Sequence, residues 1–339
     1  MNIISSAVGT SICTAGIALN ILLFWLTCCH TPAGLKEYSR ILQLSCILDF
    51  GYALMNLLCH PIAFLCSNYV VVICDGFLAR ISSDLSFVLY LIWCSFVYVH
   101  VLLPPIQFLC RHRLLCRKDA SSLNSYLLKL SPFCSVLLAA SIIVTYNGSK
   151  PTTEKQNIVK KSVAEKGFID ESGVEPFGFA TSFRDISGIT VGIFYCATFV
   201  LAYGIAIWCE YKIYCRLKSL NTSLSSTKKM QNQLKKALIA NAITPVVSTG
   251  IPSLFFVMGA AFGLSVSGST SAVISTFFTI DTLCNPILTI IYITQYKQAI
   301  YRKLSKINPF CKISHVSKVH SLTQVGSARG WAERNASFK

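Results

Sequence analysis

Charge is scarce in this sequence. Only 13% of its 339 residues are Asp, Glu, Lys or Arg, which is about half the share in a typical soluble domain. Hydrophobic residues make up 53%, and the mean hydropathy is +0.57. A soluble protein with a large core would carry charge every few residues along each helix, whereas here the charges fall in a few short blocks. The scarcity argues against a soluble domain and is typical of membrane spans of about 20 apolar residues each.

Several chemical motifs are also missing. The 16 cysteines include no CxxC pair of the kind that binds metal, and most lie within apolar runs, where a thiol behaves as a small hydrophobe. The chain has no HExxH or GxSxG motif. The sequence therefore predicts no enzyme, no cofactor and no disulfide framework.

Acidic residues are outnumbered by basic ones, 14 against 30, which gives a net charge of +16. Such an excess can indicate nucleic-acid binding. Membrane proteins, however, collect Lys and Arg in their cytoplasmic loops for reasons of insertion. Because the membrane interpretation accounts for the excess, we do not expect a nucleic-acid partner.

Long apolar runs predict an all-α membrane protein, a bundle of seven transmembrane helices within residues 1–293. The expected spans are residues 3–29, 41–66, 77–110, 126–146, 186–209, 237–262 and 271–293. Residues 294–310 have apolar positions at helical spacing with basic residues between them, which predicts an amphipathic helix on the membrane surface. Residues 311–339 are polar and Ser-rich, and we expect a disordered cytoplasmic tail.

The distribution of basic residues predicts the orientation. The segments after odd-numbered spans, together with the tail, hold 22 basic and 4 acidic residues, whereas the other side holds 7 of each. The positive-inside rule then puts the N-terminus outside and the C-terminus in the cytoplasm. The sequon that begins at Asn147 would start the long second external loop, so Asn147 is a predicted N-glycosylation site.

Four segments resemble nematode serpentine chemoreceptors of the G protein-coupled receptor superfamily. They are LKEYSRIL at 35–42 with CILD at 46–49, FLCRHR at 108–113, TKKMQNQL at 227–234, and NPILT at 285–289. Among the subfamilies, the delta type is the first choice and the str-like group the second. The resemblance implies a receptor in the plasma membrane. Members of this family are expected in the membrane of the sensory cilium. It would bind a small odorant or soluble ligand within the bundle and activate a heterotrimeric G protein.

Two features of rhodopsin-like receptors are absent from the sequence. The predicted loop at 147–189 contains no cysteine, so it cannot form a disulfide with the third helix, and Cys74 has only local candidates such as Cys66. No acidic residue precedes Arg111, so the usual ionic lock at that position is not expected. A receptor for an internal peptide or amine stays open as an alternative. A transporter or ion channel is a further alternative, although the sequence shows no repeated halves.

Polar residues inside the predicted spans are candidates for function because burial in lipid makes them costly. By resemblance, Asn20, Asp49, Asp281 and Asn285 would form a polar network that rearranges on activation, with sodium at Asp49 as an option. Asp281 and Asn285 are four residues apart and share one helix face. The competing interpretation is a static network that only holds helices together.

Six residues in the outer half are candidates for ligand binding: His60, Asp84, Tyr90, Trp93, Tyr195 and Phe255. Aromatic side chains between helices suit an apolar cleft, and Asp84 would suit a polar or cationic ligand. The competing interpretations are core packing for the aromatic residues, backbone capping for His60, and a local ion pair between Asp84 and Arg80.

Basic residues at the inner ends of the third and sixth helices predict a G-protein interface, made by Arg111, Arg113, Lys228, Lys229, Lys235 and Lys236. Acidic lipid head groups are the competing partners of this rim, and membrane lipids are expected partners in either case. Pro245 and Pro252 weaken the sixth helix and are candidates for a hinge. Cys311 is a palmitoylation candidate. A homo- or hetero-oligomer stays open.

Overall fold

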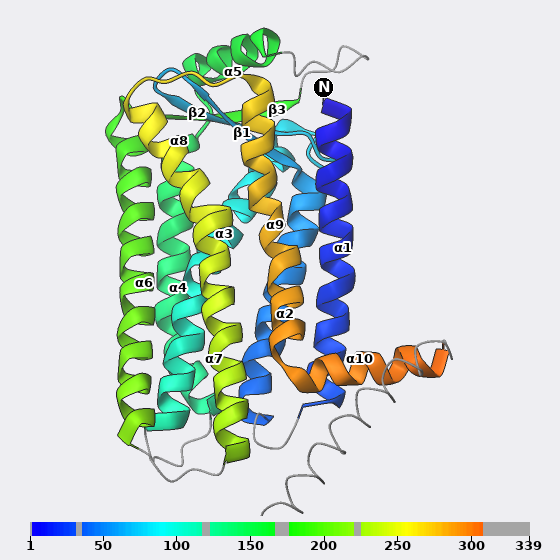
Figure 1. The fold of residues 1–339 in the computed structure, drawn as a ribbon. Coiled ribbons are helices and arrows are strands. Elements are labelled where there is room, and N and C mark those ends of the chain that lie inside the picture. The colour runs from blue at the N-terminus through cyan, green and yellow to red at the C-terminus, as the bar shows by residue number, and fades with distance from the viewer. Residues whose placement is uncertain (1, 32–35, 117–122, 167–175, 220–224, 308–339) are drawn as a thin grey trace, which may run out of the picture.

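Seven helices in the structure are long and apolar enough to cross a membrane. The computed structural model describes residues 2–31, 36–116, 123–166, 176–219 and 225–307. The spanning helices, bundled side by side in Figure 1, are α1 (Asn2–Cys29), α2 (Lys36–Cys59), α3 (Ser83–Cys116), α4 (Leu123–Ser149), α6 (Ile186–Ser219), the α7–η2–α8 unit, and α9 (Gly268–Tyr292). The predicted seven-helix membrane fold is confirmed.

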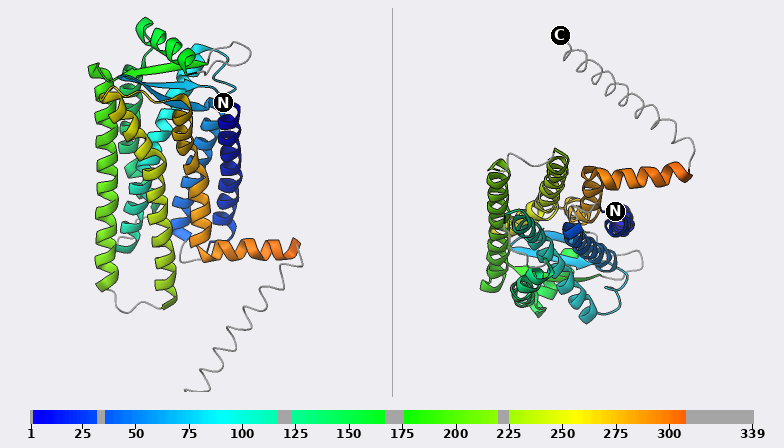
Figure 2. Two further views of the ribbon diagram at one scale, coloured as in Figure 1. Left: turned by 45° about the horizontal axis from the view of Figure 1, so that its top comes forward. Right: turned by 90° about the horizontal axis from the view of Figure 1, so that it is seen from below.

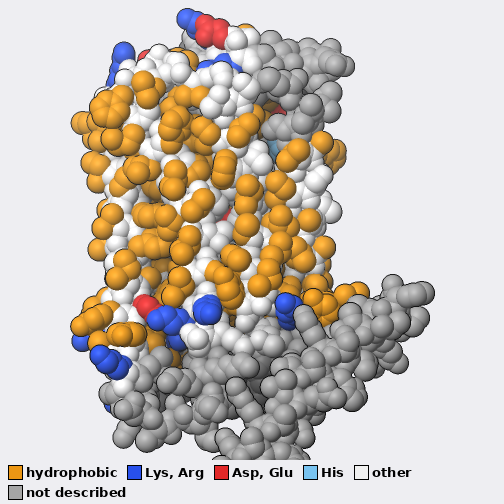
Figure 3. Space-filling model, viewed as in Figure 1, with side chains coloured by type: hydrophobic (Ala, Val, Ile, Leu, Met, Phe, Trp, Pro, Cys, Tyr) orange, Lys and Arg blue, Asp and Glu red, His pale blue; other side chains and the backbone are white. Residues whose placement is uncertain are grey.

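The outer surface of the bundle is apolar along most of its height. Figure 3 shows a continuous band of hydrophobic side chains, with Lys, Arg, Asp and Glu gathered at the two ends. Large apolar side chains such as Leu128, Ile193 and Val200 are exposed within that band. Because water would penalise so much exposed apolar surface, this band is the part of the molecule that suits lipid.

The second span ends earlier than the sequence predicted. Residues 41–66 were expected to form one helix, but α2 stops at Cys59 and is followed by a β-hairpin of β1 (Pro61–Cys66) and β2 (Tyr69–Cys74). His60 has a φ of 40°, and Pro61 disfavours helical backbone at the residue before it. A short apolar run is compatible with either a strand or a buried helix, so hydropathy alone could not distinguish the two structures.

The segment between α4 and α6, which the sequence predicts only as a long loop, contributes a helix and a third strand. Strand β3 (Phe177–Ser182) pairs antiparallel with β2 and completes a three-stranded sheet of order β1-β2-β3. Helix α5 (Thr153–Glu165) covers the outer face of this sheet, where Val159 and Val163 pack on Phe64 and Ile73. The opposite face packs on the bundle. The sheet and α5 thus close one end of the bundle in two layers (Figure 1).

The register of the hairpin rules out the local pairing of Cys66 with Cys74. Cys66 lies opposite Tyr69 at the turn, whereas Cys74 lies opposite Pro61 at the other end of the hairpin. Five residues of β2 separate those rungs by about 17 Å, beyond the reach of a disulfide.

The sixth span is interrupted where prolines were predicted to weaken it. Helix α7 (Ser225–Pro245) leads into a π-helical turn, η2 (Val246–Gly250), and then α8 (Ile251–Ala261). Pro245 and Pro252 flank this turn and remove two backbone donors. π-helical turns of this kind are frequent at functional sites.

The bounds of the third and fifth spans also differ from the predicted ones. Helix α3 begins at Ser83 rather than residue 77, because Ser82 caps the helix by accepting a hydrogen bond from the Leu85 N–H. Helix α6 continues to Ser219, ten residues beyond the predicted end.

Helix α10 (Thr294–Ile307) lies across the end of the bundle opposite the sheet, as Figures 1 and 2 show. The Lys303 ammonium sits 3.6 Å from the centroid of the Trp25 ring, which fixes α10 against α1. The N-terminus lies at the sheet end of the bundle. The predicted tail at 311–339 lies outside the described residues.

Candidate functional site

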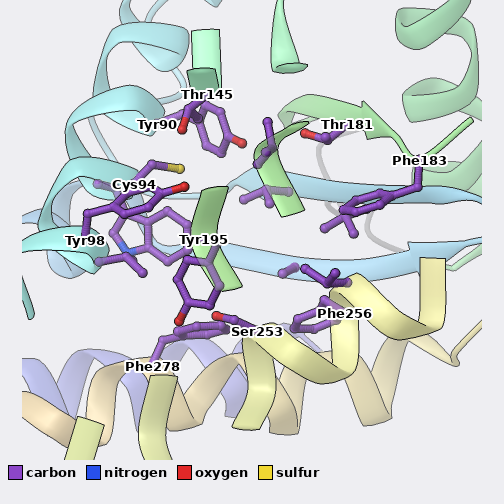
Figure 4. A pocket seen from close by; sticks show the side chains of 17 residues that line it. Tyr90, Cys94, Tyr98, Thr145, Thr181, Phe183, Tyr195, Ser253, Phe256 and Phe278 are labelled. Carbon is purple, nitrogen blue, oxygen red and sulfur yellow. The ribbon is translucent and has the colours of Figure 1, made fainter. Parts of the chain in front are cut away.

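A cavity of about 130 Å³ lies between the inner face of the sheet and the helices. Figure 4 shows side chains of 17 residues converging on it, and none of them is charged. Helix α3 supplies one wall, the sheet supplies the roof, and α4, α6, α8 and α9 complete the lining. The lining residues are Ala63, Val70, Val72, Tyr90, Trp93, Cys94, Val97, Tyr98, Thr145, Thr181, Phe183, Val191, Tyr195, Ser253, Phe256, Val257 and Phe278.

Most polar atoms of the lining already have partners in the protein. The Tyr90 hydroxyl is 2.9 Å from Ser149 Oγ, which in turn is 2.8 Å from Thr181 Oγ1. The Tyr195 hydroxyl is a buried group without a good hydrogen-bond partner among the described residues, and Ser253 lies beside it in the lining. The cavity is therefore apolar, with the neighbouring hydroxyls of Tyr195 and Ser253 as a polar point in its lining.

Three of the six predicted ligand-binding residues, Tyr90, Trp93 and Tyr195, line this cavity. Phe255 does not, because its side chain is 39% exposed on the lipid-facing side of α8, and its neighbour Phe256 points into the cavity instead. Phe255 and Phe256 are one residue apart, which is 100° on a helix and turns their side chains to different sides.

The other two predicted ligand residues also lie away from the cavity. Asp84 is exposed in the first turn of α3, where a carboxylate is stabilised by the helix dipole. The ion pair expected between Asp84 and Arg80 is replaced by one between Arg80 and Asp75. His60 lies at the junction of α2 and the hairpin, against Gly9 of α1. Burial lowers the pKa of the His60 imidazole, against the opposing effect of Asp75.

The predicted polar network forms at mid-membrane, around a residue that the sequence interpretation missed. His100 of α3 places Nδ1 2.9 Å from Asp281 Oδ2 and Nε2 3.6 Å from Asp49 Oδ1. Asn285 Nδ2 lies 3.5 Å from Asp49 Oδ2. Asn20 joins through the backbone, since its side-chain amide donates to the Thr282 carbonyl of α9 at 3.0 Å.

The signal for His100 was available in the sequence, because an ionisable residue in the middle of a span is costly without a partner. In the structure, the imidazole links α3 to both α2 and α9, and all of these side chains are buried. The network includes two buried carboxyl groups of the spanning helices, Asp49 and Asp281.

His100 lies between the two carboxyl groups, nearer to Asp281 than to Asp49. Sodium at Asp49 stays a prediction. No group of three or more His, Cys, Asp or Glu side chains suited to a metal occurs in the part of the chain that the structure describes.

A second cluster lies near the inner ends of α3, α6 and α7. Arg111 is 1% exposed, and its Nη1 lies 3.2 Å from Glu210 Oε2 of α6. The other oxygen of Glu210 lies 2.8 Å from Lys235 Nζ of α7. One carboxylate thus connects three helices. Glu210 was not predicted, although it is the one acid in an otherwise basic segment from 210 to 236.

The predicted basic rim is smaller than expected, because Arg111 is buried in the bundle rather than exposed on the rim. Arg113 stacks on the Tyr126 ring at 4.5 Å, and Lys236 is exposed. The side chains of Lys228 and Lys229 lie outside the described residues, as does Cys311.

Asn147 lies in the last turn of α4 rather than in a loop. Its side chain is exposed, but Ser149 of the same sequon is buried against Tyr90. Glycosylation of Asn147 stays a prediction, and it would have to precede folding of this turn.

Comparison with protein-family models gives a match over residues 5–301 to the family described as Serpentine type 7TM GPCR chemoreceptor Str. The chain belongs to this family. This Str chemoreceptor is therefore a multi-pass membrane protein with a chemosensory receptor role. Of the two subfamilies expected from the sequence, the match is to the str-like group, and the delta type is not confirmed. A comparison of this chain with curated proteins gave no match.

Proposed function

We propose that this receptor binds a small, uncharged, largely apolar molecule in the cavity beneath the sheet and activates a heterotrimeric G protein at the opposite end. The uncharged aromatic lining of the cavity carries this proposal. The sheet end, where the N-terminus lies, would be extracellular, and the end with α10 and most basic residues would be cytoplasmic. The receptor would then act at the plasma membrane.

The size of the cavity favours a ligand about as large as a substituted benzene. A volume of about 130 Å³ is close to that of an engineered protein cavity of about 150 Å³ that binds benzene. A peptide would not fit. A cationic amine would require a carboxylate in the lining, because an unpaired buried charge is costly. The peptide and amine alternatives are therefore less favoured than an odorant-like ligand.

The Tyr195 hydroxyl, beside Ser253, gives the site one point of polar selectivity. A ligand with a single carbonyl, ester or hydroxyl oxygen can accept a hydrogen bond from it without leaving other buried polar groups unpaired. Hydrocarbons of the same shape would lose that bond. Ligands with several polar groups would bind more weakly, because these groups would lose their hydrogen bonds to water without gaining enough partners in the lining.

The cavity is mechanically close to the polar network. Trp93 of α3 packs edge-on against Phe278 of α9, with ring centroids 5.8 Å apart. His100 follows Trp93 by seven residues and Asp281 follows Phe278 by three, so each pair shares a helix face. A ligand that separates Trp93 from Phe278 would therefore strain the contact between His100 and Asp281 and shift the population of bundle states.

At the cytoplasmic end, the Glu210 cluster would restrain α7 in the resting state. The π-helical turn between α7 and α8 supplies a deformable point about which α7 could swing. When Lys235 separates from Glu210, the inner ends of α3, α6 and α7 can open for a G-protein helix. Membrane lipids would contact the same rim in the resting state.

The test uses a matched pair of substitutions on adjacent residues of α8. The receptor is expressed with a G-protein reporter and screened against small ketones, esters, aromatic alcohols, amines and short peptides. For any agonist found, Phe256→Ala should lower potency about tenfold or more, because it removes apolar contact worth about 1.5–3 kcal/mol. Phe255→Ala, on the lipid-facing side, should leave potency within about twofold.

Equal effects of the two substitutions, or agonists found solely among amines and peptides, would contradict the proposed site. An agonist-evoked current that persists without any G protein would instead support a channel or transporter.

A further inference from the structure

Two buried cysteines meet where α2 joins the sheet. Sγ of Cys59, the last residue of α2, is 3.3 Å from Sγ of Cys74, the last residue of β2. Both side chains have no exposed surface. We propose that Cys59 and Cys74 form a disulfide bond in the mature receptor and so tether the roof of the cavity to the bundle.

The backbone holds these two residues together independently of their side chains. The Gly76 N–H donates to the Cys59 carbonyl at 2.9 Å, and the Asp75 N–H donates to the His60 carbonyl at 3.3 Å. A Cβ at position 76 would lie only 2.1 Å from the Leu58 carbonyl oxygen, so glycine is required for this close approach. The end of β2 is thereby fixed beside the end of α2.

The alternation of side chains along β2 directs Cys74 toward Cys59. Val72 and Cys74 face the bundle, whereas Val71 and Ile73 face α5. The sulfur atoms must approach by about 1.3 Å to reach bonding distance, which rotation about the side-chain torsions can supply without moving the strands. Cys66 cannot compete, because it lies at the far end of the hairpin.

The bond would form by exchange with a thiol–disulfide oxidoreductase of the secretory pathway. One cysteine thiolate attacks the disulfide of the oxidoreductase, which gives a mixed disulfide and releases one of its thiolates. The second cysteine thiolate then attacks the mixed disulfide and releases the other. The receptor loses two electrons and two protons, and the oxidoreductase ends as a dithiol. This step requires the sheet end to face the lumen during synthesis, as the proposed orientation has it.

In rhodopsin-like receptors a disulfide fixes the loop that corresponds to 147–189 to the third helix, and this chain lacks the loop cysteine for it. The proposed disulfide would instead fix the β1–β2 hairpin to α2. The segment from 147 to 189 contains no cysteine, and β3 is joined to β2 through the hydrogen-bonded pairing of the two strands. Tethering β2, the middle strand, to α2 therefore secures the sheet as a whole above the ligand cavity.

The direct test is peptide mapping of the full-length receptor, purified from eukaryotic cells after alkylation of free thiols and never reduced. Chymotryptic cleavage after Phe64 and Tyr69 separates Cys59, Cys66 and Cys74 into different peptides. The expected result is a Cys59 peptide joined to a Cys74 peptide. Its mass should be lower by two hydrogen atoms than the summed masses of the two reduced peptides, and reduction should separate them. Cys59→Ser should abolish this species, whereas Cys66→Ser, in the same hairpin, should keep it.

Recovery of Cys59 and Cys74 as alkylated thiols, or of Cys74 joined to any other cysteine, would overturn the proposal. The wild-type map decides the question even if Cys59→Ser fails to reach the cell surface. An antibody to an N-terminal tag on intact cells tests the orientation separately. A tag exposed outside together with free thiols would refute the disulfide while leaving the proposed receptor function intact.

Discussion

Replacing Lys235 with Met should raise the basal activity of the receptor. In the structure, the Lys235 ammonium lies 2.8 Å from Glu210 Oε1 and 5.6 Å from the Tyr214 ring centroid, so it joins α7 to α6 in two ways. An outward swing of α7 would break both contacts. Because Met keeps the unbranched apolar stem of Lys, the substitution removes the charge with little change in packing or helix propensity.

The expected magnitude follows from the exposure of the pair. The side chains of Lys235 and Glu210 are 32% and 20% exposed, so water screens their attraction in part. Partly exposed ion pairs contribute about 0.5–1 kcal/mol. If the pair exists in the resting state alone, its loss multiplies the small active population about two- to fivefold. Glu210→Gln should have a larger effect, because it also removes the ion pair between Glu210 and the buried Arg111.

The assay is ligand-free signalling through a G-protein reporter, normalised to surface expression of a tagged receptor. Lys212→Met is the matched control, since Lys212 is two residues from Glu210 in sequence but exposed, and its basal activity should equal that of the wild type. A rise of equal size in both variants would show that loss of general positive charge, rather than the contact with Glu210, causes the effect. No rise with Lys235→Met would refute the restraint.

Three further outcomes are expected. Val97→Phe, which fills the cavity from α3, should abolish the response to agonists while surface expression stays near that of the wild type, measured by dose–response curves and flow cytometry. His100→Phe should lower the stability of the detergent-purified receptor by about 3–5 kcal/mol, because it leaves two buried carboxyl groups without the imidazole that they contact, and Asp281→Asn in the same chain should restore part of it. Burial lowers the pKa of His60, so the neutral imidazole favours the folded state at neutral pH. This contribution of His60 to the free energy of unfolding is lost as the pH falls from about 6.5 through the lowered pKa. Thermal denaturation of the wild type should therefore shift more between pH 7.5 and 5.5 than that of His60→Gln, and equal shifts would contradict this assignment.

The gap between prediction and structure is clearest at residues 60–74. Hydropathy identified the apolar run from 41 to 66 but not the change from helix to strand at His60 and Pro61, because both structures bury apolar side chains equally well. The sheet itself depends on pairing with residues 177–182, more than a hundred positions away in the sequence. Such long-range pairing leaves no local pattern in a single sequence.

The polar network shows the same division. Lipid makes any intramembrane Asp or Asn conspicuous, so Asn20, Asp49, Asp281 and Asn285 could be selected without coordinates. Their common partner could not be identified, since the meeting of α3 with both α2 and α9 at His100 is set by how the helices rotate and tilt in the bundle.

For this chemoreceptor, the sequence alone determined the number of spans, the class of fold and the asymmetry of charge between the two ends, because the bilayer imposes a length and a polarity that each segment must satisfy independently. Tertiary structure alone decided that Phe256 rather than Phe255 faces the cavity, that Glu210 joins three helices, and that Cys59 meets Cys74. Those outcomes depend on the rotation and end of each helix relative to its neighbours, and packing between segments sets these quantities.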